Sequence, residues 1–133
     1  MNEHVKKWVA ALRSGKYEQT REVLHDNQGF CCLGVICDVL SPNSWGDPDW
    51  DNRAYEFRTN EFGCEDDGVI DYPPPGMLEM LGIHDDFGNM LVRLNDEEHY
   101  NFSQIADVIE RNVLSGRAFA PEDGSGLEWG YEV

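Results

Sequence analysis

Three of the four cysteines lie within seven positions, in the stretch GFCCLGVICDVL at residues 29–40. Thiols at this density can hold a metal, form a redox centre or provide a nucleophile. If the stretch is helical, successive side chains are about 100° apart, so Cys31, Cys32 and Cys37 fall on three different faces. Zinc sites usually take cysteines in C-x-x-C-like pairs, which this spacing does not provide. We therefore predict core packing without a metal site or cofactor, and keep a thiol- or metal-dependent enzyme as an alternative.

Basic residues gather near the N-terminus. The first 21 residues hold five Lys or Arg against two Glu, a charge of +3. Since the whole chain has a net charge of −16, the remaining residues carry −19. Such cations can bind phosphate groups, and a neighbouring aromatic ring can stack on a base. The alternative is that Lys6 and Arg13 cover the core with their stems and keep their charges in water. The candidate ligand-binding residues are Lys6, Lys7, Trp8, Arg13, Lys16, Tyr17 and Arg21.

Two acidic runs could bind a metal. In residues 47–52 (DPDWDN) three carboxylates alternate as at the start of a calcium loop, but Asn52 replaces the expected glycine and Arg58 the expected glutamate. We interpret this run as a solvated loop. The run 95–99 (NDEEH) could also serve acid–base catalysis, and we interpret it as a loop and helix start, because carboxylates favour the positive end of a helix.

Length and charge limit the class of protein. A chain of 133 residues fits one compact domain, so we expect a single domain over 1–133, with an acidic tail at 117–133 that extends from it or packs on it or on a partner subunit. No apolar run approaches the roughly 18 residues that cross a bilayer, and the N-terminus is not a signal peptide. The negative charge disfavours nonspecific nucleic-acid binding and anionic membranes. We expect a cytoplasmic protein.

Hydrophobic periodicity predicts an α+β fold. Helices are expected at 3–13, 31–40 and 102–114, with the 31–40 helix central and buried, and a short helix is expected to begin at Pro75 and end at Gly82. Asn101 and Gln104 form a capping-box pattern before the last long helix. Gly34 costs about 1 kcal/mol in a helix interior, and we expect another backbone to approach it closely.

Residues between the helices predict a small antiparallel sheet. Strands are expected at 55–58 and 69–72, with a hairpin turn at 65–68. Residues 85–89 (DDFGN) are predicted to be a turn, and the apolar run 90–94 is too short to assign.

Three blocks of residues follow one another along the chain: Trp8 with ALRSGKY at 11–17, CCLGVICD at 31–38, and LND at 94–96 with Phe102 and IADVIE at 105–110. Together they resemble an uncharacterised family of small bacteriophage and prophage proteins with CCLGVxCD and LND…F…IADxIE blocks. The resemblance implies a phage origin and provides no catalytic residues. Phage accessory proteins of this size often block a host protein or sequester a nucleotide signal, so the resemblance favours a binding protein over an enzyme.

The leading hypothesis is a non-enzymatic phage accessory protein that binds a host component in the host cytoplasm and inhibits host defence. A second hypothesis is a sponge for a nucleotide immune signal, and a third is an acidic mimic of DNA. The expected partner is a host protein or a small phosphorylated ligand, and the chain could form a homo-oligomer.

Overall fold

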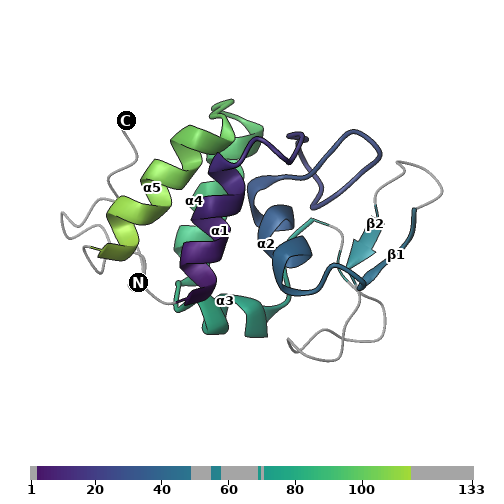
Figure 1. Ribbon diagram of the computed structural model, residues 1–133, viewed down its shortest axis with the longest axis horizontal. Helices are drawn as coiled ribbons and strands as arrows, with labels where there is room; N and C mark the ends of the chain where they lie inside the picture. Colours follow the sequence, from purple (N-terminus) through teal and green to yellow (C-terminus); the bar gives the residue numbers. More distant parts are fainter. Residues whose placement is uncertain (1–2, 49–54, 58–68, 70, 115–133) are drawn as a thin grey trace.

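The computed structural model describes residues 3–48, 55–57, 69 and 71–114, which form five helices and a two-stranded antiparallel sheet. The helices are α1 (Glu3–Arg13), α2 (Cys32–Leu40), α3 (Pro75–Leu81), α4 (Asp85–Asp96) and α5 (Phe102–Leu114). The strands are β1 (Trp45–Pro48) and β2 (Tyr55–Phe57). The sheet lies beyond α2, at the end of the molecule away from α5 (Figure 1). The predicted α+β class is confirmed.

Helix α1 forms because its apolar side chains recur on one face. Val5, Trp8, Val9 and Leu12 are all buried, and α1 packs against α2 and α5. The indole Nε1 of Trp8 donates a hydrogen bond of 2.8 Å to the backbone oxygen of Cys32. This bond attaches α1 to the first turn of α2, and the predicted helix at 3–13 is confirmed.

Helix α2 is buried on every side over its first six residues, 32–37. Cys31, predicted as its first residue, is the N-cap, and its Sγ accepts a hydrogen bond of 3.3 Å from the backbone N–H of Gly34. The backbone of Leu24 passes so close to Gly34 that a Cβ there would overlap the Leu24 carbonyl oxygen. The central buried helix and the close backbone approach are both confirmed.

Helix α4 corrects the prediction for residues 85–94. The predicted turn at 85–89 forms the first turns of α4, and the unassigned run 90–94 continues it. His84 caps this helix, since its Nδ1 accepts from the backbone N–H of Asp86 at 3.1 Å. Phe87, Leu91 and Leu94 then recur at helical spacing and are buried. The start of this helix is hard to recognise in the sequence because its cap is a histidine, which is outside the usual N-cap set of Ser, Thr, Asp and Asn.

The ends of α3 and α5 follow their sequence signals. Gly82 ends α3 in the left-handed region with φ 73°. At the start of α5, the backbone N–H of Asn101 donates to Gln104 Oε1 at 2.9 Å, and the N–H of Gln104 donates to Asn101 Oδ1 at 2.8 Å. The predicted capping box is therefore confirmed.

Strands β1 and β2 pair antiparallel with an irregular register between Trp45↔Phe57 and Pro48↔Tyr55. Phe57 also forms an antiparallel bridge with Val69, so the predicted pairing of these two segments is present at one position. Residues 71–72 are not in a strand, and the partner strand in the sheet is β1, which the sequence did not predict. The hairpin turn at 65–68, the calcium-like run after Pro48 and the acidic tail at 117–133 lie outside the described residues. Among the described helices, none combines the length and apolar character that a bilayer crossing requires.

Replacement of Gly34 by alanine should lower the free energy of unfolding by about 3 kcal/mol, the upper end for overpacking, because the new methyl group meets backbone rather than a flexible side chain. Gly46→Ala is the matched control, since its Cβ would lie 3.7 Å from the nearest atom, the Glu56 oxygen. Urea denaturation followed by circular dichroism measures both variants. Equal stability of the two would contradict the close contact at Gly34.

Candidate functional site

The residues proposed as a ligand site at the N-terminus are not gathered into one pocket. Trp8 is 0 % exposed, so its ring lies in the core and not on the surface where a ligand would stack. Its apolar neighbours on α1 place it there, and its only polar atom donates to Cys32.

Two of the candidate cations bind carboxylates of the protein itself. The Arg13 guanidinium donates to Asp107 Oδ1 at 2.6 Å and to Glu110 Oε2 at 3.1 Å, which joins α1 to α5 and raises the pKa of Arg13. Lys6 Nζ lies 3.6 Å from Glu3 Oε1. The anions that these cations hold are therefore internal.

The other candidates divide into one tyrosine and three exposed cations. The Tyr17 hydroxyl donates to Asp38 Oδ2 at 2.7 Å, and burial, with this bond, raises the pKa of Tyr17 to about 12. Lys7, Lys16 and Arg21 are exposed and form no ion pair among the described residues. None of the hollows described below is lined by any of them.

An aromatic cluster, which sequence reasoning did not identify, joins the sheet to α2. The His25 ring is stacked between Phe30, at a centroid distance of 3.8 Å, and Tyr55, at 4.3 Å. Its Nδ1 lies 2.8 Å from the carbonyl oxygen of Gly29, an acceptor that requires the proton on Nδ1. Trp45 Nε1 donates to Asp38 Oδ1 at 3.0 Å. These polar groups therefore have structural partners.

The thiols are packed in the core, as predicted. Cys31, Cys32 and Cys37 are all buried, and burial raises the pKa of Cys31 to about 12 and that of Cys32 well above its ordinary value. Cys32 Sγ lies 3.7 Å from the carbonyl oxygen of Leu91, while Cys37 Sγ lies 3.6 Å from Met77 Sδ. A thiolate nucleophile needs a lowered pKa and access; Cys31 and Cys32 have neither, and Cys37 is buried. The described residues do not bring three metal-binding side chains together.

Asn95 corrects the prediction for the run 95–99, because Asn95 and Asp96 are the last residues of α4 rather than a loop and helix start. Asn95 is 0 % exposed. Its Oδ1 accepts from Gln19 Nε2 at 2.8 Å and from the backbone N–H of Cys32 at 3.3 Å. Its Nδ2 donates to the carbonyl oxygen of Thr20 at 2.9 Å. One amide thus joins α4, α2 and the segment before α2.

Asp96 extends this network to the surface. Its Oδ1 accepts from Asn95 Nδ2 at 2.8 Å and from the backbone N–H of Glu22 at 2.9 Å. Glu22 has a backbone φ of 73°, in the left-handed region that residues other than glycine rarely adopt. The Asp96 carboxylate therefore has a fixed position and holds an unusual backbone conformation beside it.

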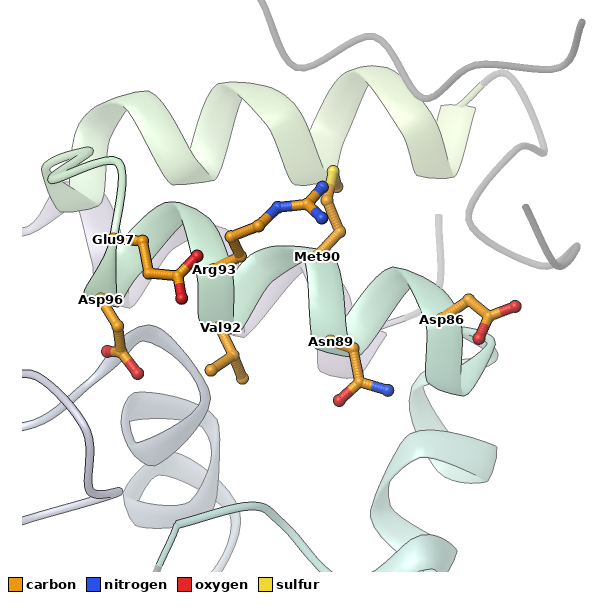
Figure 2. A pocket seen from close by; sticks show the side chains of 7 residues that line it. All are labelled: Asp86, Asn89, Met90, Val92, Arg93, Asp96 and Glu97. Carbon is orange, nitrogen blue, oxygen red and sulfur yellow. The ribbon is translucent and has the colours of Figure 1, made fainter. Parts of the chain in front are cut away.

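The outer face of α4 carries the candidate site, two adjoining hollows. Figure 2 shows the first, of about 440 Å³, where Asn89, Val92 and Asp96 project from one side of the helix and Arg93 runs toward Met90. The second hollow, of about 330 Å³, shares Asn89, Val92 and Asp96 with it. The first is lined by Asp86, Asn89, Met90, Val92, Arg93, Asp96 and Glu97, and the second by Glu22, Asp71, Tyr72, Asn89, Val92 and Asp96.

The charge of these hollows is negative. Among the described residues that line them are five carboxylates and a single basic side chain, Arg93. A third hollow, lined by Arg93, Leu94, Glu98 and Tyr100, continues past Arg93. Carboxylates spread along a groove favour a ligand with several positive charges. Sequence reasoning missed this face because it did not assign a helix at 85–96.

The chain belongs to the family described as a domain of unknown function, DUF8296, whose model matches residues 1–113. The match includes every described helix except the last residue of α5. Comparisons with curated proteins and with solved structures gave no match.

Replacement of Asn95 by alanine should lower the free energy of unfolding by about 3 kcal/mol, since it leaves the Thr20 carbonyl and the Cys32 N–H without this partner. Asn89→Ala, on the exposed face of the same helix, should change it by less than about 0.5 kcal/mol. Chemical denaturation compares the variants. Similar losses would show that Asn95 does not have the structural role assigned to it.

Native Cys31, Cys32 and Cys37 should resist iodoacetamide at pH 8, because all three are inaccessible and burial also keeps Cys31 and Cys32 protonated. Peptide mapping by mass spectrometry should find them modified only after urea unfolding. The raised pKa also makes Cys31 favour the folded state below pH 9, a contribution lost as the pH rises toward 12. Rapid native alkylation of Cys31 would restore the thiol-enzyme hypothesis.

Proposed function

We propose that this chain is a non-enzymatic phage accessory protein that binds a host component in the host cytoplasm and counters host defence. The phage origin rests on the resemblance of the CCLGVICD block and of the LND block with its following helix. The observation that supports binding is the hollowed, carboxylate-lined outer face of α4. Such a face attracts a positively charged partner over a distance and orients it on approach.

The thiols and aromatic side chains support a binding role over catalysis. Cys31 and Cys32 are buried with raised pKa values, and Tyr17 and Trp45 both donate to Asp38. These groups are engaged in holding the fold, whereas the carboxylates along α4 face solvent or are half-buried. The surface is thus better suited to hold a partner than to transform a substrate.

A second candidate function is sequestration of a phosphorylated nucleotide signal. It is favoured by Lys7, Lys16 and Arg21, which are exposed and form no ion pair within the described part of the chain. It is weakened because Trp8 is buried and Arg13 is held by Asp107 and Glu110. Lys7, Lys16 and Arg21 would therefore have to bind phosphate without the Trp8 ring to stack on a base, because that ring is buried.

Capture from the lysate of a bacterium that is a host of related phages separates these functions. The tagged protein should retain a defined host protein at about 150 mM salt and release it as salt rises, since charge pairs are screened. Mass spectrometry identifies what is retained, including small molecules released on denaturation. A nucleotide in place of a protein would favour the second candidate. Capture of neither would contradict both.

A further inference from the structure

The outer face of α4 is hollowed, and residues 22, 71 and 72 border it on one side. The inner face packs Phe87, Leu91 and Leu94 into the core, against α2 and α5. On the outer face Asn89 and Arg93 are exposed, and the two adjoining hollows follow the helix (Figure 2). From Asp86 to Glu97 this face extends about 16 Å at 1.5 Å per residue.

We propose that this face of α4 is the docking surface for a segment of the host protein that is rich in lysine and arginine. The inference rests on the proposed function, since it requires a protein partner. Charge complementarity carries it. Within the described part of the chain, Arg93 is the single cation that lines the two hollows, against the carboxylates of Glu22, Asp71, Asp86, Asp96 and Glu97. A segment with several cations spread over about 16 Å fits such a groove.

The groove also offers an apolar surface for the stems of long cationic side chains. Val92 is half-buried and lines both hollows. Lysine and arginine can lay their methylene groups over such a side chain while their charged ends reach the carboxylates. About three helical turns, or five extended residues, of the partner would cover the length from Asp86 to Glu97.

One carboxylate that lines both hollows is already positioned for binding. Asp96 accepts from Asn95 Nδ2 and from the Glu22 backbone N–H, and Asn95 is fully buried. A carboxylate fixed in this way loses little side-chain entropy when a cation binds. Asp96 lines both hollows, so it stands where they join.

A second copy of the chain is a poorer occupant. Its basic segment would be α1 and the residues after it, where Arg13 and Lys6 are already paired with Asp107 and Glu3. Association would also bring together two chains of net charge −16, which repel each other. A basic partner meets neither obstacle.

A labelled peptide of alternating lysine and alanine, about eleven residues long, is the probe, with binding measured by fluorescence anisotropy at about 50 mM salt. The double variant Asn89→Lys/Glu97→Lys adds three positive charges to the groove at exposed positions. Ala10→Lys/Glu79→Lys adds the same charge at exposed positions of α1 and α3. The groove variant should weaken binding at least about tenfold and the control less than about threefold. Equal losses would overturn the site.

Removal of the one cation in the groove tests the same surface in the opposite direction. Arg93→Gln should tighten peptide binding about threefold, whereas Lys7→Gln, which removes an exposed cation of α1, should change it little. Equal effects of the two variants would mean that only net charge matters. Sedimentation of the unmodified protein at low salt is an independent check, and a monomer is expected. A dimer that the Asn89→Lys/Glu97→Lys variant no longer forms would show that a second copy occupies the α4 face, which would overturn the basic partner.

Failure of this inference differs from failure of the proposed function. If the Asn89→Lys/Glu97→Lys variant still captures the same host protein from lysate, the partner binds elsewhere and the binding function stands. If the variant loses that protein while Ala10→Lys/Glu79→Lys keeps it, the α4 face is the docking surface. No binding of the peptide by the unmodified protein would overturn the docking surface alone.

Discussion

The buried amide of Asn95 is the interaction on which the arrangement of the other elements depends. A polar group without water must find partners within the protein, and Asn95 finds them in two separate segments, at residues 19–20 and at the start of α2. Its Oδ1 accepts the N–H of Cys32, a donor in the first turn of α2 that has no partner within that helix. The position of α4 therefore fixes the start of α2, and with it the segment that passes over Gly34.

The fold uses some of its scarce cations internally. Arg13 binds two carboxylates of α5, although the chain has only ten basic residues against 26 acidic ones. This pairing lowers the repulsion where α1 meets α5, the pair of helices in most extensive contact. Arg13 is therefore not available to the carboxylates of the α4 face, where Arg93 lies beside Asp96 and Glu97.

The parts of the fold that depend on neighbours in sequence were predictable, and the parts that depend on distant contacts were not. The apolar face of α1, the cap at Asn101 and the stop at Gly82 are local signals, and the sequence expectations agreed with them. Helix α4 was missed because DDFGN has the composition of a turn, whereas its Gly88 leaves room for the Tyr72 hydroxyl, a contact that local sequence does not reveal. Asn95 receives its partners from residues more than 60 positions away.

The spacing of the carboxylates decides between two kinds of cationic ligand. A metal ion needs several oxygen ligands directed at one point, within about 2.6 Å of it. Within the described residues no three acidic, histidine or cysteine side chains converge in this way. Along α4 the carboxylates at 86, 96 and 97 instead extend over about 16 Å, from one end of the face to the other. Charges distributed over such a length are neutralised by a chain of cations, and a folded partner can provide that chain only on a basic segment.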